Sequence, residues 1–175
     1  MTPRNLLSSL PALLFALLVY AAPASAQLGL TDITCAGAVK QTWTPGLKLV
    51  PANVHYTNYT NYNLCTSTEP TITSGVMDME ATYFNSCLAN IGGAELLVTW
   101  NDGSQSAFSV TGTGVNVAGN LQIFVSLGRV NSGRFAGDLV VLTNAYVSTQ
   151  LAACLAPAGM TSLVGTSTLV ITKVL

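Results

Sequence analysis

The sequence predicts an all-β fold: an antiparallel meander of about eight strands closed into a barrel, with a β-sandwich as the alternative. Gly, Asn, Thr and Ser interrupt the chain roughly every 10 to 15 residues, a spacing typical of sandwiches and barrels. The segments between these residues are rich in Val, Thr, Tyr and Leu, which favour strands. The connections are short, so consecutive strands are expected to run antiparallel.

Alternation of apolar and polar residues and the positions of turn residues assign the elements in chain order. Residues 149–156 have the one helical pattern, and Pro157 and Gly159 are expected to end it. The predicted strands are 33–43, 47–64 with a break near Pro51, 75–86, 94–100, 105–115, 119–130, 134–147 and 166–174.

The clearest hairpin joins the strands at 94–100 and 105–115 through Asn101-Asp102-Gly103. Asp-Gly between two apolar runs supplies the positive φ angles that a tight turn requires. A second hairpin is expected where Asn131-Ser132-Gly133 joins the two strands that follow.

Alternation also predicts which side of a strand faces the interior. In the strand at 94–100 three apolar residues share one side: Leu96, Val98 and Trp100. In the strand at 119–130 the expected inner side carries Leu121, Ile123, Val125 and Leu127, with Asn120, Gln122 and Ser126 opposite. The last strand is apolar on both sides, which is typical of a strand at the centre of a sheet.

The N-terminal segment has the layout of a secretory signal peptide. Arg4 precedes an apolar run at 10–21, and the small residues Ala24-Ser25-Ala26 follow, which places cleavage before Gln27. The apolar run is shorter than the roughly 20 residues that a membrane-spanning helix needs. We therefore expect a signal peptide at 1–26, Sec-type export, and one secreted β domain at 27–175.

Charge excludes two classes of partner for the mature chain. Without Arg4 it keeps five Lys or Arg against seven Asp or Glu, and the basic residues do not cluster. Nucleic acids and anionic membrane surfaces both select clustered Lys and Arg, so neither is expected as a partner. No later segment is apolar enough to span a bilayer as a helix, so no transmembrane segment is expected in the mature chain.

Four cysteines follow the predicted cleavage site, and an even number in an exported chain predicts two disulfides. No two of them form a Cys-x-x-Cys pair, and His55 is the one histidine, so no metal site is expected. In an antiparallel meander the first strand begins where the second ends, and the third and seventh both end at the opposite side. The alternating strand directions therefore place Cys35 near Cys65 and Cys87 near Cys154. They favour Cys35–Cys65 and Cys87–Cys154 among the three possible pairings.

Several short motifs carry a resemblance to known proteins. They are Cys35-Ala-Gly, the Pro45-Gly-Leu turn, Trp100-Asn-Asp-Gly-Ser, Gly133-Arg-Phe-Ala-Gly and the late Cys154 before a Gly-containing final strand. With these motifs the chain resembles small secreted bacterial proteins, common in actinobacteria, that consist of a disulfide-containing β domain. The resemblance implies the fold and the compartment, and it assigns no activity to any residue.

A glycine pattern points to the same shape. Gly128, Gly133 and Gly137 are spaced as in the hairpins of avidin- or lipocalin-type barrels, which the segment resembles. This resemblance implies a barrel, and no ligand residues follow from it.

The sequence favours a protein without catalytic activity or a cofactor. A serine nucleophile needs a base, and His55 lies on a predicted strand with no Gly-x-Ser-x-Gly motif elsewhere. No Gly-rich phosphate loop opens a helix.

Asp78 and Glu80 support an alternative, because both carboxylates lie on one face of a strand, roughly 6.5 to 7 Å apart at Cα. Paired carboxylates at such a distance are used in glycoside hydrolysis. A polar row that faces solvent or lines the barrel explains the same pattern.

The run VHYTNYTNYNLC at 54–65 is the strongest indication of a binding surface. On a strand, Tyr56 and Tyr62 face one side, and Tyr59 faces the other. Aromatic rings beside amides and hydroxyls suit sugars or a protein partner, although aromatic residues also simply make good strands. The predicted binding residues are Tyr56, Tyr59, Tyr62, Asn58, Asn61, Asp78 and Glu80.

These observations together favour a non-catalytic secreted binding protein for a carbohydrate, a cell-envelope component or a small ligand inside the barrel. The alternatives are a small glycoside hydrolase that uses the paired carboxylates, and a structural protein that assembles at a surface. The low charge and the exposed strand chemistry permit the second of these.

Overall fold

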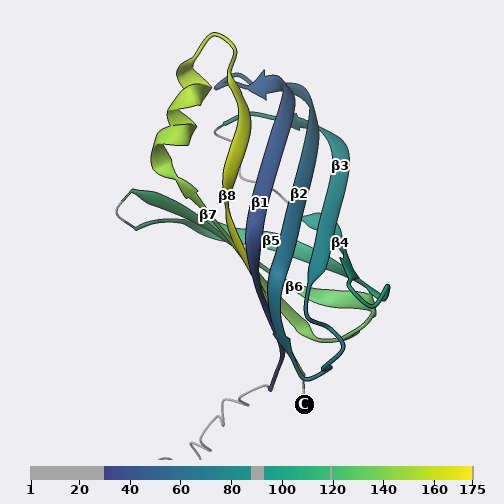
Figure 1. The fold of residues 1–175 in the computed structure, drawn as a ribbon. Coiled ribbons are helices and arrows are strands. Elements are labelled where there is room, and N and C mark those ends of the chain that lie inside the picture. Colours follow the sequence, from purple (N-terminus) through teal and green to yellow (C-terminus); the bar gives the residue numbers. More distant parts are fainter. Residues whose placement is uncertain (1–29, 88–92, 119, 175) are drawn as a thin grey trace, which may run out of the picture.

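The computed structural model describes residues 30–87, 93–118 and 120–174 and shows an antiparallel β-barrel. Each of the eight strands pairs with the next along the chain, and the last pairs with the first, so the sheet closes (Figure 1). The predicted fold class is confirmed, with the barrel rather than the sandwich. The predicted signal peptide at 1–26 lies outside the described residues.

All eight predicted strands are present, with shifted ends. They are β1 (Thr31–Leu47), β2 (Ala52–Ser67), β3 (Gly75–Asn85), β4 (Ala94–Trp100), β5 (Gln105–Ala118), β6 (Leu121–Gly133), β7 (Leu139–Val147) and β8 (Met160–Thr172). The largest shift is at the start of β8, which begins at Met160 and not at 166 and pairs with β1 over most of its length. This pairing closes the barrel, and it depends on contacts that no local pattern encodes.

Two predicted boundaries are wrong. The second strand begins at Ala52 and not at 47, because β1 continues to Leu47 and the chain then turns before Pro51, which has no N–H to donate to a ladder. Asn131-Ser132-Gly133 is not a turn, because β6 continues through it and pairs Gly133 with Ser106 of β5. The β6–β7 turn lies at 134–138, where Phe135 and Gly137 have positive φ.

The predicted helix is a 3₁₀-helix, η1 (Ser148–Leu155), which ends before Pro157 as expected. No side chain caps its N-terminus, and a single short 3₁₀ segment is typical of a connector. It lies beside β7 and β8 at one end of the barrel (Figure 1).

The predicted inner side of β6 is wrong. Leu121 and Leu127 are exposed, whereas the ring of Phe124 packs on Tyr146 with centroids 5.7 Å apart and Val130 is buried. The stripe of Leu121, Ile123, Val125 and Leu127 therefore faces outward. Alternation separates two faces without saying which is inside, and here aromatic residues of neighbouring strands fill the interior. In β4 the predicted inner residues Leu96, Val98 and Trp100 are buried.

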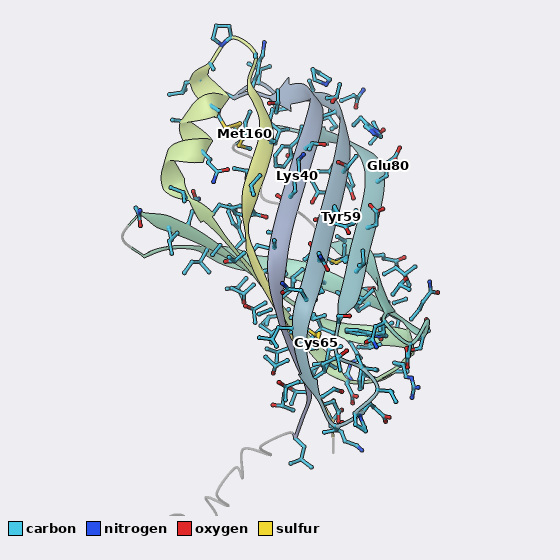
Figure 2. All side chains as sticks on the ribbon, in the orientation of Figure 1. Lys40, Tyr59, Cys65, Glu80 and Met160 are labelled. Atoms are coloured by element: carbon cyan, nitrogen blue, oxygen red, sulfur yellow. A yellow bond between two sulfur atoms is a disulfide. The ribbon has the colours of Figure 1, made fainter. Side chains whose placement is uncertain are left out.

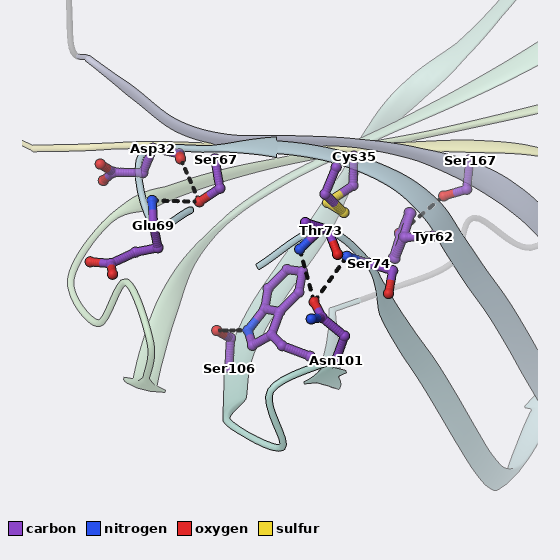
Figure 3. Close-up of a disulfide and its surroundings, with 12 residues drawn as sticks. Asp32, Cys35, Tyr62, Ser67, Glu69, Thr73, Ser74, Asn101, Ser106 and Ser167 are labelled. Atoms are coloured by element: carbon purple, nitrogen blue, oxygen red, sulfur yellow. Dashed lines mark hydrogen bonds between the residues drawn. A yellow bond between two sulfur atoms is a disulfide. The ribbon is translucent and has the colours of Figure 1, made fainter. Parts of the chain in front are cut away.

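The interior consists of two apolar clusters. The lower cluster is built around Trp100 and Phe108 and includes Ile33 and Ile171, near the start of β1 and the end of β8. The upper cluster is built around Trp43 and Tyr146. The C-terminus that follows β8 is marked in Figure 1. Trp100 lies over Gly75, where a Cβ atom would come within 2.7 Å of the indole ring, and its Nε1–H donates to Ser106 Oγ at 2.9 Å (Figure 3). A large ring over an inward glycine fills the barrel without steric conflict.

Both predicted disulfides are present. Cys35 and Cys65 are direct partners in the β1–β2 ladder, with Cα atoms 4.1 Å apart (Figure 3). Cys87 and Cys154 have Cα atoms 6.1 Å apart and join the end of β3 to η1. Two disulfides are consistent with an extracellular or other oxidising environment.

The barrel wall is incomplete on one side. β3 pairs with β2 from Gly75 to Asn85 but with β4 only from Gly75 to Met77. Among the described residues, the rest of β3 therefore has no strand partner on its β4 side. This length of β3 pairs with the part of β2 that carries Val54 and Tyr56 of the upper cluster.

Candidate functional site

The tyrosine run contributes to both faces of β2, as the alternation predicted. Asn58, Thr60 and Tyr62 are buried inside the barrel, with exposed fractions of 3%, 0% and 0%. Tyr56 also points inward but is only partly buried. Tyr59 lies on the outer surface with 49% of its area exposed.

The inner face of β2 belongs to a polar layer between the two apolar clusters. The Thr60 hydroxyl donates to Asn58 Oδ1 at 3.2 Å, and the hydroxyls of Tyr62 and Ser167 hydrogen-bond at 3.1 Å (Figure 3). Gln41 lies opposite Asn58 in the β1–β2 register and is also buried. This layer thus combines phenols, amides and hydroxyls inside an otherwise apolar barrel.

Two buried polar atoms of β7 have no hydrogen-bond partner in the described part of the chain: Asn144 Oδ1 and the Tyr146 hydroxyl. Asn144 lies opposite Ser167 on β8 and Tyr146 opposite Gly165, so both residues belong to the polar layer. Tyr146 is only 2% exposed. Leaving a buried polar group without a partner costs roughly 1 to 3 kcal/mol, so such atoms are rare and require an explanation.

The tyrosines of this layer are held in their neutral form. Burial, with the nearby Tyr56 and Tyr62, raises the pKa of Tyr146 well above its ordinary value. Burial and Tyr83 raise the pKa of Tyr56, and a hydrogen bond to Gln41 only partly offsets them. Burial raises the pKa of Tyr62 to about 12, against the opposing hydrogen bond from Ser167. At neutral pH these side chains offer uncharged hydroxyls.

Aromatic rings line the interior beside the polar layer. The ring of Tyr56 lies 5.7 Å from Trp43 and 5.8 Å from Tyr83, and Phe124 contacts Tyr146 on the β6–β7 side. Tyr56, Tyr83 and Phe124 all remain partly exposed although they point inward. Solvent therefore reaches the interior at this end, where β3 lacks β4 as a partner.

This part of the interior carries no charge. Within the described residues, every inward position of the polar layer and the upper cluster is apolar, aromatic or neutral and polar. Lys40 and Asp78 alternate with the inward positions of β1 and β3, and both side chains are exposed. The chemistry available inside is hydrogen bonding and ring contact, without a cation or a carboxylate.

The structure separates the predicted carboxylates from this interior. Asp78 and Glu80 share one face of β3 as expected, but it is the outer face, opposite Tyr59 and Thr57 of β2 (Figure 2). His55 Nε2 lies 3.4 Å from Glu80 Oε1, with the two side chains 45% and 71% exposed. A glycosidase acid is kept protonated by burial, and this exposed face does not supply it.

Asn61 also lies on the outer face and is exposed, next to Tyr59 along β2. Lys40 of β1 and Asp78 of β3 are the direct cross-strand neighbours of Tyr59. Lys40, Tyr59 and Glu80 mark this surface across three adjacent strands (Figure 2). The seven predicted binding residues therefore divide into an inner set of Tyr56, Asn58 and Tyr62 and an outer set of Tyr59, Asn61, Asp78 and Glu80.

Sequence reasoning missed the residues of β7 and β8 in the polar layer, Asn144, Tyr146 and Ser167. They are far from the tyrosine run along the chain and meet it only because the barrel closes. The one available signal was that Asn144 and Tyr146 are two residues apart on a strand and so share a face.

A carboxyl pair at the other end of the barrel was also missed. Burial and the neighbouring Asp32 carboxyl raise the pKa of Asp138, while the backbone N–H of Val174 and the charge of Lys173 oppose the shift. Asp32 accepts a hydrogen bond from Thr68 Oγ1 at 3.2 Å. Over the described ranges, no group of three or more His, Cys, Asp or Glu side chains is placed to bind a metal ion. Nor does this part of the chain contain a helix long and apolar enough to cross a membrane.

Comparison of the chain with protein-family models, with curated proteins and with solved structures gave no match. The resemblance to secreted actinobacterial β domains therefore stays a prediction, and function has to be inferred from the geometry of the barrel alone.

Proposed function

We propose that this chain is a secreted, non-catalytic binding protein that takes a small molecule into the upper half of its barrel. The observation that carries the proposal is the pair of buried polar atoms, Asn144 Oδ1 and the Tyr146 hydroxyl, that find no hydrogen-bond partner among the described residues. They lie in the same interior that solvent reaches beside Tyr56 and Phe124. Small-molecule sites typically combine an apolar, aromatic lining with a few polar groups that fix orientation.

Each part of this interior has a role in the proposal. The rings of Trp43, Tyr56 and Tyr83 provide flat apolar surface for the body of the ligand. Asn144 and Tyr146 supply hydrogen-bonding groups that the described part of the chain leaves unsatisfied. A ligand that pairs with them removes a cost already present in the free protein, so this part of its affinity needs no new desolvation of the protein.

A binding screen of the mature protein against neutral and charged small molecules tests the proposal, with Tyr56→Ala as the interior variant and Tyr59→Ala as the matched control. Removing an aromatic anchor commonly weakens binding by about 2 kcal/mol or more. We expect Tyr56→Ala to lose ligand affinity and Tyr59→Ala to keep it. Ligands that respond only to Tyr59→Ala would contradict an interior site.

A second candidate is recognition of a sugar or cell-envelope component on the outer face of β1–β3. It is favoured by the half-exposed ring of Tyr59, which lies between the side chains of Lys40 and Asp78. An exposed ring flanked by polar groups suits the apolar face and hydroxyls of a sugar. Polysaccharide binding that Tyr59→Ala abolishes and Tyr56→Ala leaves unchanged would support this candidate instead.

A further inference from the structure

We propose that the interior site selects an uncharged ligand that carries both a hydrogen-bond donor and an acceptor, and that it rejects carboxylates of the same shape. This inference rests on the proposed function and defines the class of ligand. It depends on two observations: which polar atoms lack partners, and which charges the interior lacks.

The absence of charge argues against an anionic ligand. A carboxylate taken into an apolar interior needs a cation or several donors, because desolvation of an unpaired charge is costly. The Lys and Arg residues of the described chain are all exposed, and Lys40, on β1 beside the polar layer, points outward. The phenols stay neutral, since burial raises the pKa of Tyr56, Tyr62 and Tyr146. A cationic ligand would also lose its hydration without gaining an opposite charge, because Asp78 and Glu80 lie on the outer face.

The two atoms without partners define complementary requirements. Asn144 Oδ1 is an acceptor only and needs a donor from the ligand. The Tyr146 hydroxyl can donate to a ligand acceptor. The two residues are two apart on β7 and share a face, so their Cα atoms are separated by roughly 7 Å. A ligand that pairs with both atoms therefore needs a donor for Asn144 Oδ1 and an acceptor for the Tyr146 hydroxyl, and a primary amide carries both.

Phe124 lies beside Tyr146 in this interior. Its ring packs on Tyr146 and is itself partly exposed, so a ligand approaching Tyr146 from this side would contact Phe124.

Three probes of matched shape test the inference on the mature chain: benzamide, benzoate and benzylammonium, measured by isothermal titration calorimetry at neutral pH. Benzamide offers a donor to Asn144 Oδ1 and an acceptor to the Tyr146 hydroxyl, whereas benzoate has no donor. We expect benzamide to bind at least about tenfold more tightly than either ion, since a missing partner for a buried polar group is penalised strongly.

Two conservative variants separate the ligand contact from a structural role. Tyr146→Phe removes a hydroxyl that has no partner among the residues the structure describes, so it should weaken benzamide binding about tenfold without lowering the melting temperature. Ser106→Ala, beside Trp100 in the lower cluster, removes a buried hydroxyl that accepts from Trp100 Nε1–H and donates to the Arg134 carbonyl, so it should lower the melting temperature and leave benzamide affinity unchanged.

The outcomes are distinguishable. Benzoate binding as tightly as benzamide would overturn the charge selectivity and leave the interior site standing. If Tyr146→Phe leaves the benzamide affinity unchanged, the inference is also overturned. That result would indicate that ordered water satisfies Asn144 Oδ1 and the Tyr146 hydroxyl. The wider screen decides the case in which none of the three probes binds. Charged interior ligands from that screen would overturn the inference, and neutral ones would support it. A screen without any interior ligand would remove the proposed function itself.

Discussion

Tyr59 and Tyr62 lie three residues apart on one strand and differ completely in environment. Tyr62 is fully buried and hydrogen-bonded to Ser167, while Tyr59 has 49% of its area exposed. The period of two in a strand forces this difference, because an odd separation puts two side chains on opposite faces. Tyr56 shares the inner face with Tyr62, but it lies where the barrel wall is open and stays partly exposed.

Alanine substitutions of the tyrosines should therefore have three different costs. Tyr62→Ala should lower the free energy of unfolding by about 3 to 5 kcal/mol, since it leaves a cavity in a packed interior. Tyr59→Ala should change it by about 0.5 kcal/mol or less. Tyr56→Ala should fall between them. Urea denaturation of the three variants measures the costs, and equal destabilisation by all three would contradict the alternating placement.

The carboxyl pair predicts a pH dependence. The folded state raises the pKa of Asp138, so above the ordinary value of 3.8 the folded chain binds its proton more tightly than the unfolded chain. Stability contributed by this group is therefore present at low pH and is lost as pH rises through the raised pKa. Asp138→Asn removes the charge but keeps the Oδ1 that accepts from the Val174 N–H at 3.2 Å.

We expect Asp138→Asn to raise the melting temperature at pH 7 and to give no advantage near pH 3. The control is Asp78→Asn, which changes an exposed carboxylate on the outer face. Thermal unfolding of both variants across this range measures the effect. A stabilisation by Asp138→Asn that does not change with pH would show that charge is not its cause.

At the scale of elements, the two disulfides constrain the barrel differently. Cys35–Cys65 joins residues that already pair in the β1–β2 ladder and closes 30 residues. Cys87–Cys154 closes 67 residues and holds the end of β3 against η1. Among the described residues β3 pairs with β4 only from Gly75 to Met77, so the second disulfide adds a covalent restraint where the far end of β3 lacks this partner.

Replacing each cysteine pair with alanine should show this difference. The chain-entropy model gives a loss of about 3.5 kcal/mol for the shorter loop and about 4.5 kcal/mol for the longer one. Loss of Cys87–Cys154 should also speed amide hydrogen exchange in β3 beyond Met77, whereas loss of Cys35–Cys65 should leave that segment unchanged. Faster exchange in β3 after loss of Cys35–Cys65 alone would contradict the assignment.

The β8 strand makes room for the site through Gly165. A Cβ atom there would lie 2.2 Å from the Ala145 carbonyl oxygen and 2.7 Å from a ring carbon of Tyr146. Gly165→Ala should therefore cost about 1 to 3 kcal/mol as overpacking and displace the Tyr146 ring. Gly93→Ala, whose nearest contact would be 3.5 Å, is the matched control and should be nearly neutral. Equal stability of the two variants by urea denaturation would contradict the close packing of Tyr146.

At the scale of the whole molecule, the fold was more predictable than the site. Turn spacing and alternation are local, so they predicted the number of strands, and parity along the meander predicted both disulfides. The inner face of β6 was mispredicted because alternation separates the two faces of a strand without showing which one is inside; Phe124 faces inward and packs on Tyr146, while Leu121 and Leu127 are exposed.

The proposed site could be predicted only in its β2 part. Tyr56, Asn58 and Tyr62 come from one conspicuous run, but Phe124 and Asn144 reach them through barrel closure. The closure of the barrel and the register between its strands depend on pairing over the whole chain, and no local sequence pattern specifies that pairing. The unpaired length of β3, which exposes this interior, is likewise a property of the assembled sheet.

The central claim is that a small molecule binds in the upper half of the barrel, and the two tryptophans of the chain test it directly. Trp43 belongs to the upper cluster beside Tyr56, and Trp100 belongs to the lower one. The measurement is ¹⁹F NMR of mature protein labelled with 5-fluorotryptophan, with the two signals assigned by Trp43→Phe, during titration with benzamide and the ligands found by screening. We expect saturable shifts of the Trp43 signal with the Trp100 signal unchanged; shifts of Trp100 alone, or of neither signal on addition of a bound ligand, would contradict the claim.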